Sequence, residues 1–246
     1  MSGSASGALE RPARTLTSRR ASVALDRLLG RVAGPGLLVL CLASSQVALA
    51  AEIPYEQFIQ TRPLIENASP NARQVAAWVI RTDDNQGLPF LIVDKVNAQA
   101  LAFDRRGLLI GVAPALLGLA KGDDSLPGVG DRPLSGISPD ERITPAGRFV
   151  AVLGKNLNGK GILWLDYDAA ISLHPVITGS AADRRQHRLT TTTAGDNRIS
   201  YGCINVPAVF YETIVGPLFR STVGIVYVLP EVRSIETVFF APPVSD

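Results

Sequence analysis

Cysteine, histidine and methionine are scarce in this chain of 246 residues, which contains two, two and one of them. So few nitrogen and sulfur ligands argue against a zinc site, and we expect no metal. Lysine and arginine outnumber aspartate and glutamate by only 24 to 22. The chain therefore lacks the excess of basic residues that would indicate a nucleic-acid partner. Charged residues make up 19% and hydrophobic residues 46%, which excludes a disordered chain and predicts a folded core.

The first 50 residues differ from the rest in charge. They hold six arginines against two acidic residues, a net charge of +4, whereas the remaining residues net −2. An apolar run begins at Gly36, and a small-x-small sequence ends at Ala50. This order predicts a secretory signal peptide over residues 1–50 with cleavage near Ala50. We therefore expect an exported protein of the periplasm or cell envelope.

The alternative for this segment is a permanent membrane anchor. Ser44, Ser45 and Gln46 interrupt the apolar run, which falls short of the roughly 20 residues that a spanning helix needs. We therefore expect no membrane span after signal cleavage. Cleavage also removes Cys41 and leaves Cys203 unpaired, so Cys203 is either a buried core residue or a reactive thiol.

The rest of the sequence predicts a mainly β fold with a few helices. Residues 51–87 predict a largely helical N-terminal segment, with one helix beginning at Ser69-Pro70. The main domain is expected over residues 88–246, with a long Gly- and Pro-rich loop at 122–147. Apolar patterns predict strands at 90–94, 100–103, 108–112, 148–153, 162–166, 170–174 and 223–229, and helices at 180–189 and 208–214.

The most informative segment surrounds Cys203. Gly202 permits a tight turn that leaves the thiol accessible, and backbone N–H groups in such a turn can stabilise an oxyanion. The helix predicted after Pro207 would favour the thiolate through its positive N-terminal end. A cysteine nucleophile needs a base, normally a histidine, and the chain offers only His174 and His187.

Two short motifs, in order, resemble the L,D-transpeptidase (YkuD-type) family. Residues 200–205, Ser-Tyr-Gly-Cys-Ile-Asn, are similar to its Ser/Thr-His-Gly-Cys-hydrophobic-Asn/Arg signature. Residues 144–149, Thr-Pro-Ala-Gly-Arg-Phe, are similar to its upstream Thr-Pro-x-Gly-x-Phe segment. The hairpin expected over 90–103 resembles the strand pair that opens that domain. The resemblance covers roughly residues 88–230.

The resemblance implies a β-sandwich-like catalytic domain, without a cofactor, that acts on peptidoglycan stem peptides. In this family the cysteine attacks the carbonyl between an L-centre and a terminal D-alanine, D-alanine leaves, and an amine resolves the acyl-enzyme. Some members use water, so an L,D-carboxypeptidase is a second interpretation. A non-catalytic peptidoglycan-binding homologue is a third. The resemblance also implies inhibition by carbapenems, which acylate the cysteine.

The family's roles transfer to matching positions of the second motif. Cys203 is the expected nucleophile, Gly202 shapes the oxyanion turn, and Ser200 supports the histidine and the loop. Tyr201 stands where many members have histidine, and tyrosine is a poor base near neutral pH. Tyr201 and Asn205 are expected to contact the substrate.

The choice of base stays open between two histidines. His187 has the spacing from Ser200 that compact family members show, but it lies in an arginine-rich stretch expected to be a solvated helix. His174 ends a strand, as the family's histidine does, although Pro175 replaces the glycine that follows it. An inserted helix over 180–189 would explain the longer spacing. Rigid strand ends position catalytic groups well, which favours His174.

Arg148 is a further candidate for substrate binding. It lies in the upstream motif, and a guanidinium can bind a substrate carboxylate through two hydrogen bonds. The alternative is an exposed strand arginine without such a role.

These considerations predict that His174→Ala abolishes acylation of Cys203 by a carbapenem, whereas His187→Ala leaves most of it. The reason is the strand-end position of His174 and the cationic surroundings of His187. Stopped-flow measurement of acylation compares the two variants. The opposite pattern would assign the base to His187.

Overall fold

The protein is described by a computed structural model that covers residues 65–177 and 181–240. The expected signal peptide, residues 51–64 of the expected helical segment and Ser180 lie outside the described residues. All structural statements below refer to the described part of the chain.

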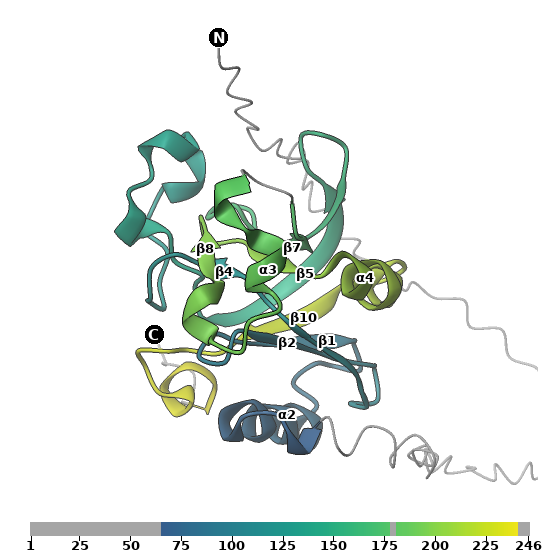
Figure 1. Cartoon of the computed structure of the whole chain (residues 1–246). Helices are drawn as coiled ribbons and strands as arrows, with labels where there is room; N and C mark the ends of the chain where they lie inside the picture. Colours follow the sequence, from purple (N-terminus) through teal and green to yellow (C-terminus); the bar gives the residue numbers. More distant parts are fainter. Residues whose placement is uncertain (1–64, 178–180, 241–246) are drawn as a thin grey trace, which may run out of the picture. The chain divides into compact units, whose positions relative to one another are not determined.

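Strands dominate the described chain (Figure 1), which confirms the mainly β prediction. Eight strands form one sheet in the order β3-β2-β1-β10-β5-β6-β7-β9, and β4 pairs with β8 in a separate two-stranded sheet. The large sheet buries hydrophobic side chains on both faces. The strands are β1 Phe90–Asp94, β2 Gln99–Phe103, β3 Leu109–Pro114, β4 Leu117–Gly118, β5 Gly147–Lys155, β6 Gly161–Asp166, β7 Ile171–Pro175, β8 Arg198–Ser200, β9 Ile204–Val206 and β10 Gly224–Val228.

The predicted hairpin at the start of the domain is present. Strands β1 and β2 pair antiparallel, with Phe90 opposite Phe103. Alternate side chains of a strand point to opposite faces, so Leu91 and Val93 enter one hydrophobic cluster and Ile92 enters the other. Both faces are buried, which explains why this strand reads as a continuous apolar run.

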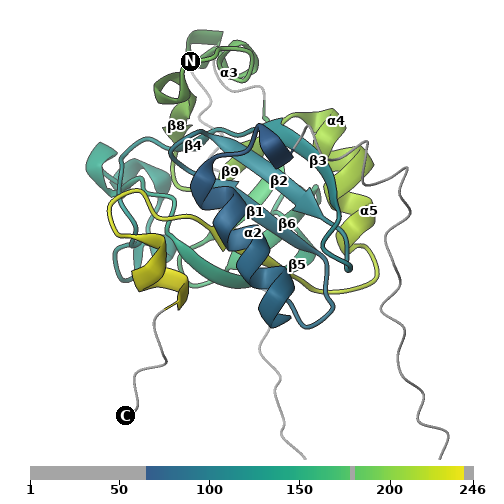
Figure 2. The ribbon, with the colours of Figure 1, turned by 90° about the horizontal axis from the view of Figure 1, so that it is seen from below.

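One face of the sheet is covered by helix α2, Pro70–Thr82, which lies across β1 and β2 (Figure 2). The helix begins where the sequence predicts it. Ser69 accepts a hydrogen bond from the backbone N–H of Ala72, and Pro70 occupies the first turn, where no N–H is needed. It ends at Asp83 in a left-handed conformation. The helix shares a core with the sheet and is part of the same folded unit.

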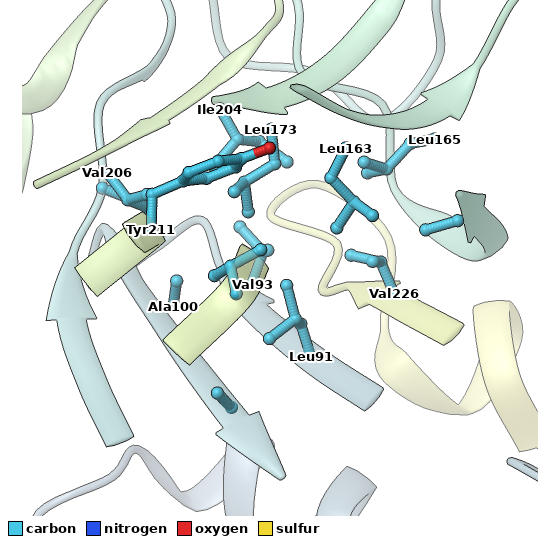
Figure 3. Packing of buried hydrophobic residues seen from close by; sticks show 14 of the residues in the cluster. Leu91, Val93, Ala100, Leu163, Leu165, Leu173, Ile204, Val206, Tyr211 and Val226 are labelled. Atoms are coloured by element: carbon cyan, nitrogen blue, oxygen red, sulfur yellow. The ribbon is translucent and has the colours of Figure 1, made fainter. Parts of the chain in front are cut away.

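The other face is covered by the segment that follows Pro207. It forms α4 (Ala208–Phe210), the π-helical η6 (Tyr211–Val215) and α5 (Gly216–Phe219), which extends the predicted helix by one turn. The ring of Tyr211 lies beside Leu173, Ile204 and Val206 (Figure 3). The helical segment therefore packs against the buried face of β7 and β9.

The long connections are less regular. The expected loop at 122–147 contains three short turns, η1 (Val129–Asp131), η2 (Leu134–Gly136) and η3 (Pro139–Glu141). The helix expected at 180–189 is divided into η4 (Ala181–Asp183) and α3 (Arg185–Arg188), and η5 (Ala194–Asn197) leads into β8. A further turn, η7 (Glu236–Phe240), packs beside α2.

A buried cluster of charged residues joins several of these connections. The Lys95 ammonium, which is fully buried, donates to Asp123 Oδ1 at 2.9 Å and to the carbonyl of Thr144 at 2.9 Å. Glu231 pairs with both Lys95 and Arg198, so the strand that precedes Cys203 is tied to the same cluster. Burial of a charge is costly unless it is paired, so each member depends on the others.

The electrostatics of Asp123 follow from its contacts. Burial alone would raise the pKa of its carboxyl, but backbone N–H groups at 231–233 and the Lys95 ammonium outweigh burial and hold the pKa at about 2. For Lys95, burial dominates over its acidic partners and lowers the ammonium pKa below its usual range. The folded protein therefore strongly favours the ionised carboxyl of Asp123.

We predict that Asp123→Asn lowers the free energy of unfolding by about 3 kcal/mol at neutral pH, because it leaves Lys95 without its closest carboxylate. A carboxyl whose pKa is lowered by folding contributes stability that is complete above about pH 4 and is lost as the pH falls towards 2. The difference between wild type and variant should therefore shrink over that window. Urea denaturation at several pH values measures it, and a difference independent of pH would contradict the assignment.

Candidate active site

Cys203 lies in a tight turn between two short strands. Residues 201–203 connect β8 to β9, and Cys203 as a residue is partly exposed. Gly202 has a φ of +127°, and a Cβ on it would lie 2.7 Å from the carbonyl oxygen of Ile143. Both the backbone conformation and the close approach require glycine here.

Side chains next to the turn fix its backbone. The Ser200 hydroxyl donates to the carbonyl of Cys203 at 2.6 Å and accepts from the Gly202 N–H at 3.1 Å. The Asn205 amide donates to the same Cys203 carbonyl at 3.3 Å. Ser200 and Asn205 are both almost completely buried, so these hydrogen bonds are shielded from water and hold the turn in one conformation.

The upstream motif supports the same turn. The Thr144 hydroxyl donates to the carbonyl of Gly202 at 2.8 Å and accepts from the Gly118 N–H at 2.8 Å. Thr144 is fully buried, and its own carbonyl accepts from Lys95. The two motifs that are far apart in the sequence therefore meet at the Cys203 turn.

His174 reaches Cys203 through the pairing of β7 with β9. The strands are parallel, with His174 opposite Asn205 and Leu173 opposite Ile204. Leu173 and Ile204 point into the core, so His174 and Cys203 share the other face. The Nδ1 atom of His174 lies 2.8 Å from the carbonyl of Pro175. A carbonyl only accepts, so Nδ1 carries the proton and Nε2 is left to interact with the thiol.

The thiol and the imidazole change each other's acidity. Burial would raise the pKa of the Cys203 thiol, but the hydrogen bond and charge of His174, helped by Ser172, lower it overall. Burial would likewise lower the pKa of His174, but its interaction with Cys203 raises it overall. Both shifts favour transfer of the proton from sulfur to imidazole. Such a pair can supply a thiolate nucleophile at neutral pH.

Two further groups contact the sulfur. The Ser172 hydroxyl lies 3.5 Å from Sγ, and the carbonyl of Ala170 lies 3.5 Å from Sγ as an acceptor for the S–H. Ser172 precedes His174 by two residues on the same strand and so faces the same side. Its hydroxyl can donate a hydrogen bond to a thiolate. The alternation of side chains along β7 would have identified Ser172 in the sequence, because it places Ser172 and His174 on the same face.

The helix predicted after Pro207 does not adjoin the thiol. Strand β9 intervenes between Cys203 and the helix that begins at Ala208. Burial raises the pKa of the Cys203 thiol, and His174 and Ser172 together outweigh burial and lower it. The helix begins at Ala208 as predicted, and what the sequence missed is β9, because a three-residue strand is too short to show a periodic pattern.

The structure places the other sequence candidates in different surroundings. Tyr201 is the first residue of the turn that carries Cys203, and the guanidinium of Arg142 lies 4.0 Å from its ring centroid. The Arg148 guanidinium instead bonds to the carboxylate and the carbonyl of Asp84, at 2.6 and 2.8 Å. Arg148 lies on the α2 side of the sheet, opposite Tyr227 of β10. It is not brought to the thiol.

His187 lies on α3 and is exposed. It lines a surface concavity together with Arg184, Arg188, Thr191 and Asp196. Within the described residues its side chain makes no hydrogen bond to Cys203. The structure therefore pairs His174, and not His187, with the thiol.

Arg185 was not singled out from the sequence. Its Nη1 donates to Asn205 Oδ1 at 3.1 Å, and its Nε donates to Asp183 Oδ2 at 3.0 Å. Its charge acts to lower the pKa of His174, against the net rise described above. In the sequence it is hidden in a run of arginines, and only the folding of α3 against β9 distinguishes it.

The assembled groups suit nucleophilic acyl transfer. They comprise a thiol with a lowered pKa, an imidazole oriented by a carbonyl, and a turn with constrained backbone. In the described part of the chain, no three His, Cys, Asp or Glu side chains lie together as metal ligands.

Comparisons with known proteins gave matches to solved structures. No protein-family profile and no curated protein matches the chain. The NMR structure of the catalytic domain from E. faecium L,D-transpeptidase is 18% identical, with a TM-score of 0.25, and the match covers 57% of this chain and 96% of that one.

Two crystal structures match over a smaller share of their length. The helical cell shape determining protein Pgp2 from Campylobacter jejuni is 15% identical with a TM-score of 0.38, covering 62% of this chain and 49% of that one. A mutant of Enterococcus faecium L,D-transpeptidase is 18% identical with a TM-score of 0.31, covering 57% of this chain and 49% of that one. The chain thus spans about half the length of these two. L,D-transpeptidases, which the two motifs resemble, are among the matched structures.

The geometry predicts how the thiol responds to pH. The rate of Cys203 alkylation by iodoacetamide should rise with pH, and the midpoint of this rise should lie below the usual thiol pKa of about 8.5, because imidazolium stabilises the thiolate. His174→Gln should raise this midpoint and slow alkylation at pH 7 about tenfold or more. Ser172→Ala, which removes a weaker contact, should shift it less. Identical profiles for wild type and His174→Gln would contradict the pairing.

Proposed function

We propose that this chain is an exported cysteine L,D-transpeptidase that acts on peptidoglycan stem peptides through an acyl-enzyme on Cys203. The observation that carries the proposal is the thiol–imidazole pair, in which the carbonyl of Pro175 orients His174 and Cys203 lies in a turn held by both family-like motifs. A wall-binding protein without catalysis would not need a thiol with a lowered pKa.

In the first step His174 accepts the thiol proton, and the sulfur attacks the carbonyl carbon that precedes a terminal D-alanine. A carbon–sulfur bond forms, and the carbonyl oxygen takes up negative charge. The Gly202 N–H is engaged by Ser200, so the Cys203 N–H is the candidate donor to this oxyanion. The carbon–nitrogen bond then breaks, and imidazolium gives its proton to the amine of the departing D-alanine.

In the second step an acceptor amine from another stem attacks the thioester. His174 takes a proton from the attacking amine, the carbon–sulfur bond breaks, and the proton returns to sulfur. Water in place of the amine would give an L,D-carboxypeptidase by the same steps. The two activities share every residue named here and differ in access of the acceptor.

The remaining substrate contacts are proposals of the same kind. Tyr201 and Asn205 flank the nucleophile, and both are held in place, by Arg142 and by Arg185. Arg148 is engaged with Asp84 on another face of the sheet, and nothing in its contacts supports a role in substrate binding.

Location in the periplasm or cell envelope rests on the signal-like sequence of residues 1–50. No helix in the described ranges is long and apolar enough to cross a bilayer. The export proposal is independent of the chemistry proposed for Cys203.

We predict that incubation with a carbapenem adds the mass of one inhibitor molecule to the protein, because the activated thiol opens the β-lactam ring. Cys203→Ser should lose the adduct, and a stem tetrapeptide ending in D-alanine should release D-alanine only with wild type. Intact-protein mass spectrometry and an assay for free D-alanine measure the two effects. A folded wild-type protein that forms no adduct and releases no D-alanine would favour the peptidoglycan-binding interpretation.

A further inference from the structure

The segment that connects the strands β7 and β8 of the site places an arginine side chain next to the site. Residues 176–197 connect β7, which holds His174, to β8, which precedes Cys203. Helix α3 lies in this segment and presents Arg185 towards β9. The sequence signature of the second motif does not include this residue.

The Arg185 guanidinium is held from two sides. Nη1 donates to Asn205 Oδ1 and Nε donates to Asp183 Oδ2, and the side chain is 17% exposed. Asn205 in turn donates to the carbonyl of Cys203. One side chain therefore separates the guanidinium from the backbone of the nucleophile, and the fork is oriented before any ligand arrives.

Part of this guanidinium is available to a ligand. Within residues 65–177 and 181–240, its Nη2 group has no hydrogen-bond partner, whereas Nε and Nη1 are both engaged. Its positive charge also acts to lower the pKa of His174, against the larger effect of Cys203. A partly exposed guanidinium with an unused N–H pair is suited to an anionic ligand.

The neighbouring arginines of the same helix are placed differently. Arg188 donates through Nε and Nη1 to the backbone carbonyls of Asp183 and Asp196, so it braces the segment. Arg184 is exposed and lines the surface concavity that also contains His187. Among these arginines, Arg185 is the one that contacts a residue of the Cys203 motif.

We propose that Arg185 binds the terminal carboxylate of the donor peptide and so selects peptides that end in a free carboxyl group one residue beyond the reacting carbonyl. This inference rests on the proposed function, in which Cys203 attacks the carbonyl before a terminal D-alanine. Consecutive α-carbons are about 3.8 Å apart, so the carboxylate of that last residue lies close to the reacting carbon. Arg185 is linked to the Cys203 backbone through one side chain, because Asn205 accepts from its guanidinium and donates to the Cys203 carbonyl.

Binding of a carboxylate by Arg185 gives a definite selectivity. A charge-assisted hydrogen bond of this kind is worth about ten- to a hundredfold in affinity. A peptide amide of the same sequence presents no negative charge to the guanidinium, so its affinity should be lower by about this ten- to hundredfold factor. A residue that only braces Asn205 would affect both peptides equally.

The test measures binding to Cys203→Ala, which cannot be acylated. Calorimetric titration compares a stem tetrapeptide ending in D-alanine with the same peptide carrying a C-terminal amide. We expect the free acid to bind about ten- to a hundredfold more tightly. Adding Arg185→Gln should remove this difference, and Arg185→Lys should restore part of it, because lysine keeps the charge without the planar fork.

Arg184→Gln is the matched control, because it removes the same charge from the adjacent, exposed position and should leave the preference for the acid intact. A circular-dichroism spectrum and a thermal unfolding midpoint of Arg185→Gln that match those of the parent protein would show that the fold is preserved. The inference is overturned if Cys203→Ala binds neither peptide, binds both equally, or keeps its preference after Arg185→Gln. A preference that depends on Arg185 in a protein whose Cys203 is never acylated would instead overturn the catalytic proposal alone.

Discussion

The parallel pairing of β7 with β9 is the constraint on which the site depends. Its register sets His174 opposite Asn205 and directs Leu173 and Ile204 into the core. A slip of one residue would send His174 towards the hydrophobic cluster and leave Cys203 without its imidazole, since alternate side chains face opposite sides. The apolar residues beneath the site therefore do as much to fix the geometry of the His174–Cys203 pair as the polar residues above it.

The turn that carries Cys203 is fixed by polar groups from distant parts of the chain. Thr144 joins it to the long loop, and Lys95 and Arg198 join that region to Glu231. Each of these groups is buried and would be costly without its partner. This mutual dependence gives the upstream threonine motif a structural role, because Thr144 supports the backbone of the turn that carries Cys203.

The sequence was most informative where local patterns decide the structure. The helix after Ser69, the hairpin from Phe90 to Phe103 and the strand near the C-terminus are set by caps, turns and apolar runs, and all are present. Strands β8 and β9 have three residues each, too few to show a period, so neither strand was predicted. The charged cluster around Lys95 and the approach of Arg185 to Asn205 join residues far apart in sequence, and no local pattern encodes them.

The proposed chemistry needs one group that accepts and returns the thiol proton, which explains how a tyrosine can occupy position 201. A histidine there would place a second titratable imidazole next to the thiol, whereas the phenol of Tyr201 lies beneath the cation of Arg142. Within the described residues, His174 is then the one imidazole positioned to hold the thiol proton, with its Nδ1 bound to the carbonyl of Pro175. Acyl transfer through a thioester needs one such group, because the proton taken from sulfur is the proton given to the leaving amine. A single imidazole is therefore sufficient for both proposed steps, and the tyrosine removes no group that the chemistry requires.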